Sequence, residues 1–267
     1  MVTNFETYLR KSDLSENTIR SYLWTINYFF SQYEKVNSKS LLAYKEWLLR
    51  KFKPQTINLR LQAINKYLEF ARKFDMRLKP VRVQQKSFIE NVISNADYRY
   101  LKTMLKKDGL EEWYFVVWYM TATGARVSEL IQIKAEHVVA GYLDLYTKGG
   151  KIRRIYIPKT LCRESLEWLS RKSINSGYIF QNRYGERITT RGVGVRLKDF
   201  AYKYGLNPNV VYPHSFRHRF AMNFLEKFND LALLADLMGH ENIETTRIYL
   251  RRTSSEQRAI VDRIVTW

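Results

Sequence analysis

The sequence predicts a mainly α-helical protein with a small β-hairpin, organised as a helical first domain and a mixed α/β second domain. Apolar residues recur at steps of three and four through most of the chain, the pattern of amphipathic helices. Strict alternation occurs only around residues 141–158, and helical periodicity fails around Pro80. With 267 residues, 45% of them hydrophobic, the chain is long enough for two domains of ordinary size.

The first domain is expected over residues 1–78. Ser15 is predicted as an N-cap, and Pro54 fits the first turn of a later helix. Helices are expected at residues 4–10 and 40–52. Another is expected directly after Ser15, with its apolar stripe over residues 19–33, and a further one from Pro54, with its apolar stripe over residues 57–71. Basic side chains opposite the apolar stripe of the last helix are candidates for DNA phosphate contacts, and a solvated surface is the equal alternative for each. These residues are Arg60, Lys66, Arg72 and Lys73.

A basic linker is expected over residues 79–88, where Pro80 interrupts the helical pattern and Arg82 is a further candidate for DNA contact. Such a linker would let two domains close around a duplex, and a surface loop within one domain is the alternative. The second domain then covers residues 89–267.

The first half of the second domain contains a predicted helix stop and a predicted hairpin. Gly124 ends one helix and the next begins near Arg126, where backbone N–H groups favour an anion. Residues 141–158 predict a β-hairpin with Gly149-Gly150 at its turn and Lys148 and Lys151 at its tip. Helical patterns cover residues 95–106, 111–122, 159–172 and 190–204, with a short extended piece at 178–181.

The second half brings together residues that can hold and attack a phosphate. Pro213 opens a helix that places His214, Arg217 and His218 on one face. A helix at 231–238 stops at Gly239 and leaves His240 in a turn, and Asn242 is expected to cap a further helix that reaches Tyr249. A last helical pattern covers residues 256–265. In this basic chain, Tyr249 is a candidate nucleophile for DNA strand cleavage.

The charge points to a polyanionic partner. The formal net charge is +19 and the pI is about 9.9; a merely soluble basic protein is the alternative. Residues 1–86 hold 17 Lys+Arg and 7 Asp+Glu (17 − 7 = +10), leaving 19 − 10 = +9 for the rest. The single cysteine, Cys162, argues against a disulfide framework. With no apolar signal region, and no apolar run near the roughly 20 residues that span a bilayer, we expect a cytoplasmic protein.

Four separated motifs resemble the tyrosine recombinase, or phage integrase, family. They are Gly124-Ala125-Arg126-Val127-Ser128-Glu129-Leu130, Thr147-Lys148-Gly149-Gly150-Lys151, His214-Ser215-Phe216-Arg217-His218, and Gly239-His240 followed nine positions later by Tyr249. The chain is similar to Xer-type and other simple recombinases. The resemblance implies a core-binding (SAM-like) first domain and a catalytic second domain, which together form a C-shaped clamp on DNA.

The resemblance also implies an assembly and a reaction. A homotetramer on paired inverted half-sites in double-stranded DNA would exchange strands through a Holliday junction, and the C-terminal helix would dock on the next protomer. The free protein is expected to be a monomer or weak dimer. Integration, inversion and resolution are all compatible with the sequence.

The chemistry of the reaction suits the basic residues. Arg126 and Arg217 can grip the non-bridging oxygens of a doubly anionic phosphorane, because each guanidinium offers paired donors in a plane. A hairpin lysine can protonate the leaving 5′-oxygen. The family points to Lys148 for this role, and Lys151 is the alternative.

The remaining roles follow the family positions. Tyr249 would form a 3′-phosphotyrosine link, His214 would accept its proton or hydrogen-bond the phosphate, and His240 would donate to a non-bridging oxygen. His218 and Glu129 are expected to brace the site from behind.

Other interpretations are weaker. His214 and His218 stand four apart, but Ser215 replaces the glutamate of a zinc protease and Arg217 would repel a metal, so neither metal nor cofactor is expected. The competing functions are a catalytically silent architectural or regulatory DNA-binding protein and a type IB topoisomerase.

Overall fold

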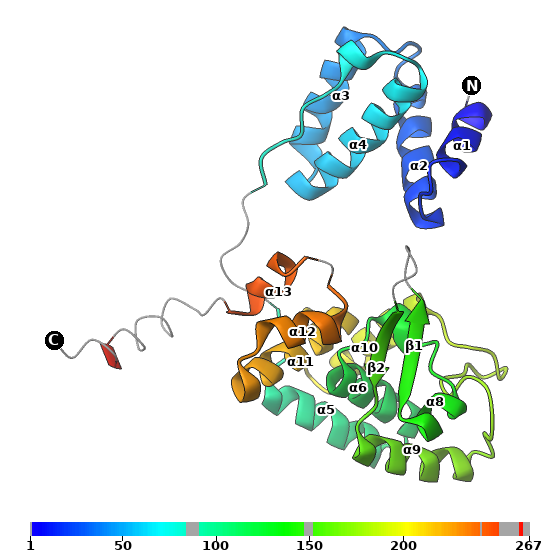
Figure 1. The fold of residues 1–267 in the computed structure, drawn as a ribbon, viewed down its shortest axis with the longest axis vertical. Helices are drawn as coiled ribbons and strands as arrows, with labels where there is room; N and C mark the ends of the chain where they lie inside the picture. The colour runs from blue at the N-terminus through cyan, green and yellow to red at the C-terminus, as the bar shows by residue number, and fades with distance from the viewer. Residues whose placement is uncertain (1, 84–90, 147–151, 241, 251–261, 264–267) are drawn as a thin grey trace. The chain divides into compact units, whose positions relative to one another are not determined.

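The computed structural model describes residues 2–83, 91–146, 152–240, 242–250 and 262–263. The chain divides into two compact units, Met1–Gln85 and Lys86–Trp267, drawn in Figure 1. Each unit has a hydrophobic core of its own. The boundary between the units falls among residues 79–88.

The first unit is entirely helical in its described part. Its elements are α1 (Val2–Arg10), α2 (Glu16–Gln32), α3 (Ser38–Lys51), α4 (Pro54–Phe70) and the short 3-10 helix η1 (Phe74–Met76). The Ser15 hydroxyl caps α2 by accepting the Thr18 N–H at 3.3 Å, as predicted. Because α4 ends at Phe70, Arg72 and Lys73 lie beyond this helix and not on its basic face as expected.

Aromatic side chains from different helices fill the core of the first unit. Phe5 of α1 meets Tyr67 of α4 edge to face, with ring centroids 5.2 Å apart. Phe29 of α2 meets Tyr44 of α3 in the same way at 5.3 Å. The predicted apolar stripes therefore face one another, which is how amphipathic helices bury their surface.

The second unit is mainly helical with one antiparallel hairpin, and this confirms the predicted fold class. Its elements are α5 (Asn95–Lys107), α6 (Glu111–Thr123), α7 (Val127–Leu130), α8 (Ala135–Ala140), β1 (Tyr142–Tyr146), β2 (Ile152–Tyr156), α9 (Lys159–Arg171), α10 (Thr190–Lys203), α11 (Pro213–Phe228), α12 (Leu231–Met238), α13 (Glu244–Arg247) and the 3-10 helix η2 (Ile248–Leu250). Helix α8 was not predicted, because a segment of six residues is too short to show a helical period.

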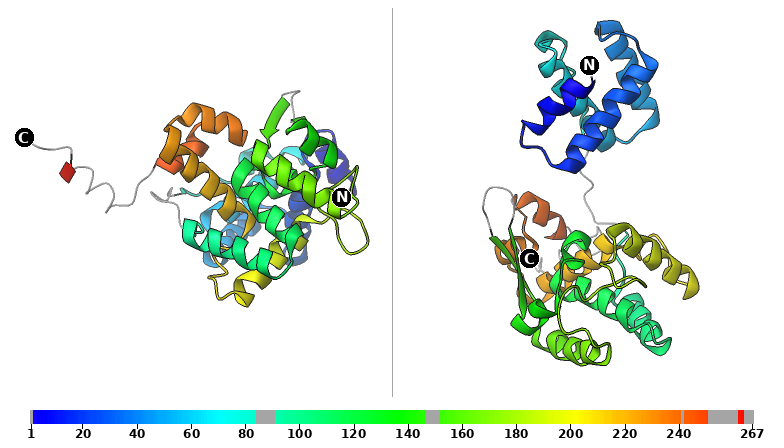
Figure 2. Two further views of the ribbon diagram at one scale, coloured as in Figure 1. Left: turned by 90° about the horizontal axis from the view of Figure 1, so that it is seen from below. Right: turned by 90° about the vertical axis from the view of Figure 1, so that its right-hand side faces the viewer.

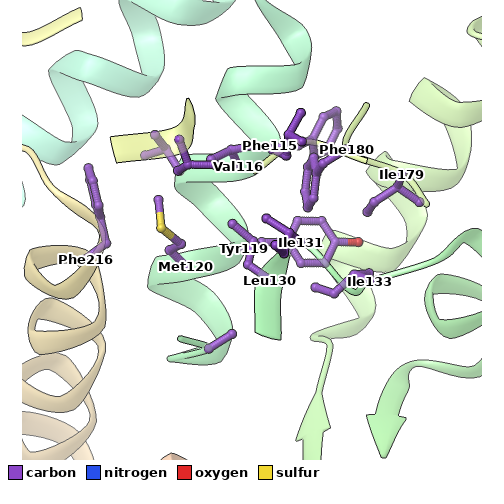
Figure 3. Close-up of a cluster of buried hydrophobic side chains, with 14 of the residues drawn as sticks. Phe115, Val116, Tyr119, Met120, Leu130, Ile131, Ile133, Ile179, Phe180 and Phe216 are labelled. Carbon is purple, nitrogen blue, oxygen red and sulfur yellow. The ribbon is translucent and has the colours of Figure 1, made fainter. Parts of the chain in front are cut away.

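Helix α6 is the centre of the second unit. It packs against both α5 and α11, as Figures 1 and 2 show. Most of its residues from Phe115 to Thr123 are buried, with Phe216 of α11 on one side of the helix and Phe180 on the other (Figure 3). A helix that is apolar on every face belongs in a core. Because α6 is packed in the core, the residues that directly follow it in the chain have a fixed position in the second unit.

Two glycines end helices where the sequence predicts. Gly124 closes α6 with φ 62°, and Gly239 closes α12 with φ 60°, a backbone conformation that favours glycine. A Cβ at Gly124 would collide with the Phe220 ring, and one at Gly239 would collide with the Arg153 side chain. Both chain reversals therefore require glycine for space as well as for conformation.

The segment after Gly239 differs in detail from the prediction. The N-cap of α13 is Ile243, whereas Asn242 accepts the Glu244 N–H with its side-chain oxygen at 2.8 Å. The helix ends at Arg247, so Tyr249 lies in η2. The hairpin tip with Lys148 and Lys151, and most of the helix expected at 256–265, lie outside the described residues. Among the helices described, none has the length and apolar character needed to cross a membrane.

Candidate active site

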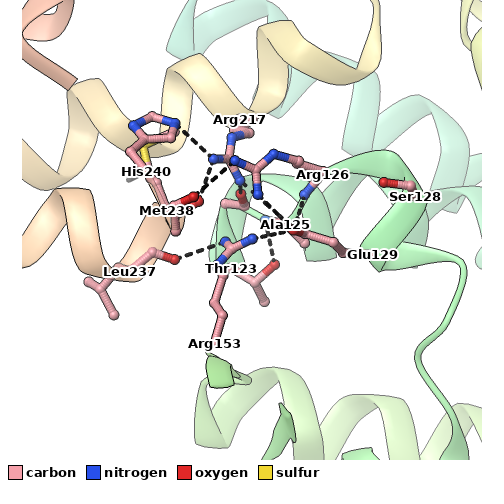
Figure 4. Close-up of polar contacts among 12 residues, drawn as sticks. Thr123, Ala125, Arg126, Ser128, Glu129, Arg153, Arg217, Leu237, Met238 and His240 are labelled. Atoms are coloured by element: carbon pink, nitrogen blue, oxygen red, sulfur yellow. Dashed lines mark hydrogen bonds and ion pairs between the residues drawn. The ribbon is translucent and has the colours of Figure 1, made fainter. Parts of the chain in front are cut away.

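Three guanidinium groups surround one carboxylate in the second unit. Arg126 precedes α7, Arg153 lies on β2 and Arg217 lies on α11, and all three face Glu129 (Figure 4). The Glu129 Oε1 atom accepts from Arg126 Nη1 at 2.8 Å and from Arg153 Nη1, while Oε2 lies 3.9 Å from Arg217 Nη1. The cluster has a formal charge of 3 − 1 = +2, which suits an anionic ligand.

Glu129 remains ionised within this cluster. Burial alone would raise its pKa, but the charges of Arg153 and Arg126 and hydrogen bonds from Arg126 outweigh burial, so its pKa lies below the ordinary value. The Arg126 backbone N–H donates to Glu129 Oε2 at 2.6 Å. Glu129 therefore caps the start of α7 and orients the Arg126 side chain.

The same arginines bind the C-terminus of α12. Arg153 Nη2 donates to the Leu237 carbonyl at 2.9 Å, and Arg217 Nη2 donates to the Met238 carbonyl at 2.6 Å. Arg126 Nη2 donates to the Gly239 carbonyl at 3.1 Å. The last carbonyls of a helix have no donors within the helix and carry its negative end. Each of three successive carbonyls is thus matched with one guanidinium.

Of Arg126 and Arg217, the two arginines predicted to hold the phosphate, Arg217 is the more buried. Its residue surface is 3% exposed, and Nη1 donates to the Gly124 carbonyl at 2.5 Å. Burial, together with the charges of Arg126 and Arg153, lowers its pKa to about 10. Arg217 is therefore still cationic at neutral pH, whereas Arg126 has 38% of its side chain exposed and is the more accessible group.

His240 lies between Arg217 and Thr246. Its Nε2 atom is 3.0 Å from Arg217 Nη2, and its Nδ1 atom is 2.8 Å from the Thr246 hydroxyl. Burial and the nearby arginines lower its pKa to about 4, so the ring is neutral. Because a guanidinium only donates, Nε2 must accept, and the ring proton lies on Nδ1 and is donated to Thr246.

Tyr249 is hydrogen-bonded to His218. The phenol oxygen lies 2.7 Å from His218 Nδ1. Burial raises the pKa of Tyr249 to about 12, partly offset by the charge of Arg217, and burial with His214 and Arg217 lowers the pKa of His218 to about 4. Both groups are neutral at pH 7, so the phenol donates and the imidazole accepts.

The two neighbouring histidines are placed differently from the expectation. His214 was expected to accept the tyrosine proton or to hydrogen-bond the phosphate; it is exposed on the first turn of α11, and its ring centroid lies 6.2 Å from that of His218. His218, expected only to brace the site, makes the hydrogen bond to Tyr249. A helix face predicts which side chains are neighbours, but it does not decide which of them η2 will meet.

Arg153 is the site residue that sequence reasoning missed. It pairs with Leu145 across the hairpin, and only 7% of its surface is exposed. The signal was present, because Ile155 and Ile157 mark the inward positions of this alternating segment and Arg153 falls in the same phase. A charge at an inward position indicates a buried partner.

Two of the candidate DNA contacts in the first unit are tied to their own unit. Arg60 Nη1 donates to the Thr25 hydroxyl at 2.7 Å, and the guanidinium lies over the Trp24 ring, 4.1 Å from its centroid. Lys66 Nζ pairs with Glu69 at 2.8 Å. Arg60 thus connects α4 to α2, whereas the Lys66–Glu69 pair lies within α4.

The other candidates in this unit differ in exposure. Lys73 Nζ donates to the Val36 carbonyl at 2.9 Å and is half-buried. Arg72 and Arg82 are exposed. In the part of the chain that the structure describes, no group of three His, Cys, Asp or Glu side chains is arranged to hold a metal ion.

Comparisons with known proteins show which family and which solved structures the chain is similar to. The model of the phage integrase family matches residues 83–256. Tyrosine recombinase XerA of Pyrococcus horikoshii is 30% identical over 98% of this chain and 93% of its own length. XerH site-specific recombinase, in a post-cleavage complex with palindromic difH substrate, has a TM-score of 0.72 at 16% identity, covering 98% of this chain and 85% of that chain. A lambda integrase tetramer bound to a Holliday junction has a TM-score of 0.72 at 15% identity, covering 94% and 78%.

Proposed function

Because the chain belongs to the phage integrase family of tyrosine recombinases, we propose that it is a site-specific recombinase that cleaves and rejoins DNA through Tyr249. The observation that carries this proposal is the placement of the Tyr249 hydroxyl. It is hydrogen-bonded to a neutral histidine, and the charge of Arg217 partly offsets the rise that burial causes in the pKa of Tyr249. A phenol in that position has both a proton acceptor and a nearby binding site for the phosphate that it attacks.

The proposed step is a transesterification in which the number of phosphate ester bonds does not change. The Tyr249 oxygen forms a bond to phosphorus, its proton passes to His218, and the bond from phosphorus to the 5′-oxygen breaks. Arg126 and Arg217 stabilise the negative charge that grows on the non-bridging oxygens. The product is a 3′-phosphotyrosine with a free 5′-hydroxyl, and attack by a 5′-hydroxyl reverses the step without an external energy source.

The histidines take different parts in this proposal. His218 accepts the proton while the new bond forms, because the pKa values of about 12 for Tyr249 and about 4 for His218 make transfer before attack unfavourable. His214, being exposed on the same helix face, is assigned to the phosphate. The Nε2 atom of His240 now accepts from Arg217. His240 can donate to a non-bridging oxygen only after this hydrogen bond breaks and the ring proton moves from Nδ1 to Nε2.

The leaving 5′-oxygen takes a proton from Lys148, with Lys151 as the alternative. A DNA substrate with sulfur in place of that oxygen separates the two, because a thiolate leaves without a proton. If a lysine is the general acid, its alanine variant should cleave slowly on the normal substrate and regain cleavage on the sulfur substrate. The alanine variant of the other lysine should not regain cleavage in this selective way. The rates of adduct formation by Lys148→Ala and Lys151→Ala on both substrates are the measurement.

The assembly is part of the proposal. Residues 1–78 and 89–267 would form the C-shaped clamp on double-stranded DNA, and four protomers on paired inverted half-sites would exchange strands through a Holliday junction. The solved structures named above, one a DNA complex and one a tetramer on a Holliday junction, support this arrangement. A ring of head-to-tail contacts closes such a tetramer.

The test is covalent capture of DNA. Duplexes that the protein selects from a random pool, each carrying a nick that lets the cleaved fragment diffuse away, should trap a denaturant-resistant adduct with the wild-type chain. Tyr249→Phe should bind the same DNA and form no covalent adduct. The control Tyr212→Phe changes a neighbouring tyrosine and should form the adduct as the wild-type chain does. An adduct that persists in Tyr249→Phe would sink the nucleophile assignment.

The same experiment separates the competing functions. Binding without any adduct from the wild-type chain would indicate a silent DNA-binding protein. Relaxation of supercoiled plasmids by a monomer, with no requirement for paired sites, would indicate a type IB topoisomerase. A recombinase should instead join fragments from two site-bearing duplexes.

A further inference from the structure

We infer that Arg153 is a positioning residue of the active site, which holds Glu129 and the C-terminus of α12 so that Arg126 and Arg217 face the reacting phosphate. The inference rests on the proposed function and adds a residue to it. Arg153 comes from β2, whereas the other residues of the cluster come from α7 and α11. One side chain thus ties the hairpin to the helices that carry the predicted chemistry.

Arg153 is too enclosed to touch DNA itself. Only 6% of its side chain is exposed. Its Nη1 atom donates to Glu129 Oε1, and its Nη2 atom donates to the Leu237 carbonyl at 2.9 Å. Its two terminal nitrogens are therefore directed at two different elements of the site. Any effect of Arg153 on the reaction must pass through those elements.

Gly239 fits the Arg153 side chain. A Cβ at Gly239 would overlap the Arg153 Cδ and Nε atoms. The stem of Arg153 therefore passes directly against the turn that ends α12, and the next residue in that turn is His240. The Gly239 carbonyl accepts from Arg126. Arg153 and Arg126 thus hold the same turn, one through the Leu237 carbonyl and the other through the Gly239 carbonyl.

The charge of Arg153 also matters to its neighbours. Glu129 Oε1 receives hydrogen bonds from both Arg153 and Arg126. Without Arg153 the cluster charge falls from +2 to +1, and Glu129 has only Arg126 and Arg217 to compensate it. The two arginines would then be drawn toward the carboxylate, and they would stabilise a doubly charged phosphorane less well.

The experiment compares Arg153→Met and Arg153→Lys with a matched control. Arg154→Met changes the next residue of β2, whose exposed guanidinium pairs with Asp144 at 2.7 Å. Each variant is assayed for adduct formation at the site where the wild-type chain cleaves. One substrate carries the normal phosphodiester there, and the other carries an uncharged methylphosphonate.

We expect Arg153→Met to form adduct about 100-fold more slowly on the phosphodiester, the size of effect caused by misplacing catalytic groups by about 1 Å. The loss should be much smaller on the methylphosphonate, because less negative charge develops there. Arg153→Lys should lose less than Arg153→Met, since it keeps the charge but not the two-way hydrogen bonding. DNA affinity and the Arg154→Met control should stay near wild type.

An independent readout does not require activity. The charge of Arg153 is one of the causes that lower the pKa of His240, so the NMR titration of His240 should shift to higher pH in Arg153→Met. Arg153→Lys tests the same positioning role if the methionine variant fails to fold.

Several outcomes would overturn the inference. These are wild-type cleavage by folded Arg153→Met or Arg153→Lys, equal losses on both substrates, and an unshifted His240 titration in folded Arg153→Met. A wild-type chain that forms no adduct would instead contradict the proposed function, and the His240 titration would still test whether Arg153 is coupled to the turn.

Discussion

Both units of the chain are strongly basic, yet they hold their charge in opposite ways. In the second unit, Arg153 and Arg217 are almost fully buried, and their hydrogen bonds go to Glu129, to His240 and to backbone carbonyls. In the first unit, Arg72 and Arg82 are exposed, whereas Arg60, Lys66 and Lys73 are partly buried. Buried charge is little screened by salt, whereas surface charge is strongly screened.

The difference between buried and exposed basic groups separates two tasks, stabilising a transition state and binding DNA. Groups held by several hydrogen bonds in a dry place can stabilise a transition state, because they do not need to reorganise when charge develops. Exposed cations add affinity for DNA of any sequence, and that affinity weakens as salt rises. We therefore expect changes in the guanidinium cluster to affect the reaction, and changes in exposed residues of the first unit to affect binding.

The largest effect should come from Arg217→Lys. Lysine keeps the charge but loses the planar set of donors that now reaches Gly124, Met238 and His240. Adduct formation should fall by about 100- to 1000-fold, the usual cost of removing one donor to a developing anion, with DNA affinity changed only a few-fold. Equal losses in single-turnover rate and in affinity would show that Arg217 merely anchors DNA.

The next effect is a pH dependence of stability that belongs to the second unit. All four histidines lie there, and the pKa values of His218 and His240 are lowered to about 4. As pH falls below about 6.5, the unfolded chain takes up two protons that the folded chain does not, so stability falls. Glu112 acts in the opposite sense, because burial raises its pKa to about 7 and the folded chain takes up its proton first.

The net difference is 2 − 1 = 1 proton from these three groups. The free energy of unfolding should then fall by about 1 kcal/mol per pH unit between about pH 6 and 5. Urea denaturation at several pH values measures this slope. Glu112→Gln should make the slope steeper, and replacing His218 and His240 with Gln should flatten or reverse it. A wild-type slope of zero would mean that the histidines are not held neutral.

The smallest effects should come from the surface of the first unit. Arg72→Gln and Arg82→Gln should each weaken DNA binding a few-fold and lower the slope of log affinity against log salt by about 1. Arg60→Gln should instead destabilise the first unit by about 1 kcal/mol, because Thr25 and the Trp24 ring lose their partner. If Arg60→Gln lost more DNA affinity than Arg72→Gln, the assignment of Arg72 to DNA binding and of Arg60 to stability would be wrong.

The helices and their ends could be predicted because their signals are local. Ser15 caps α2 through a residue three positions away, and Gly124 and Gly239 end helices at the positions predicted from their sequence context. The exceptions are also local in cause. Helix α8 is too short to show a period, and Arg72 and Lys73 continue a helical pattern past the point where α4 stops.

The sequence by itself identified most of the chemical groups that we propose for the site, because motifs and spacing point to Arg126, Arg217, His240 and Tyr249. Only the tertiary structure decided how they are joined. His218 meets Tyr249 across 31 positions, and Arg153 reaches Glu129 across 24 positions and Leu237 across 84. Contacts of this kind depend on how whole elements pack, and no local periodicity specifies them. The hydrogen bond from Tyr249 to His218 and the buried position of Arg153 were therefore not specified by the sequence pattern, and they are the placements that add most to the description of this site.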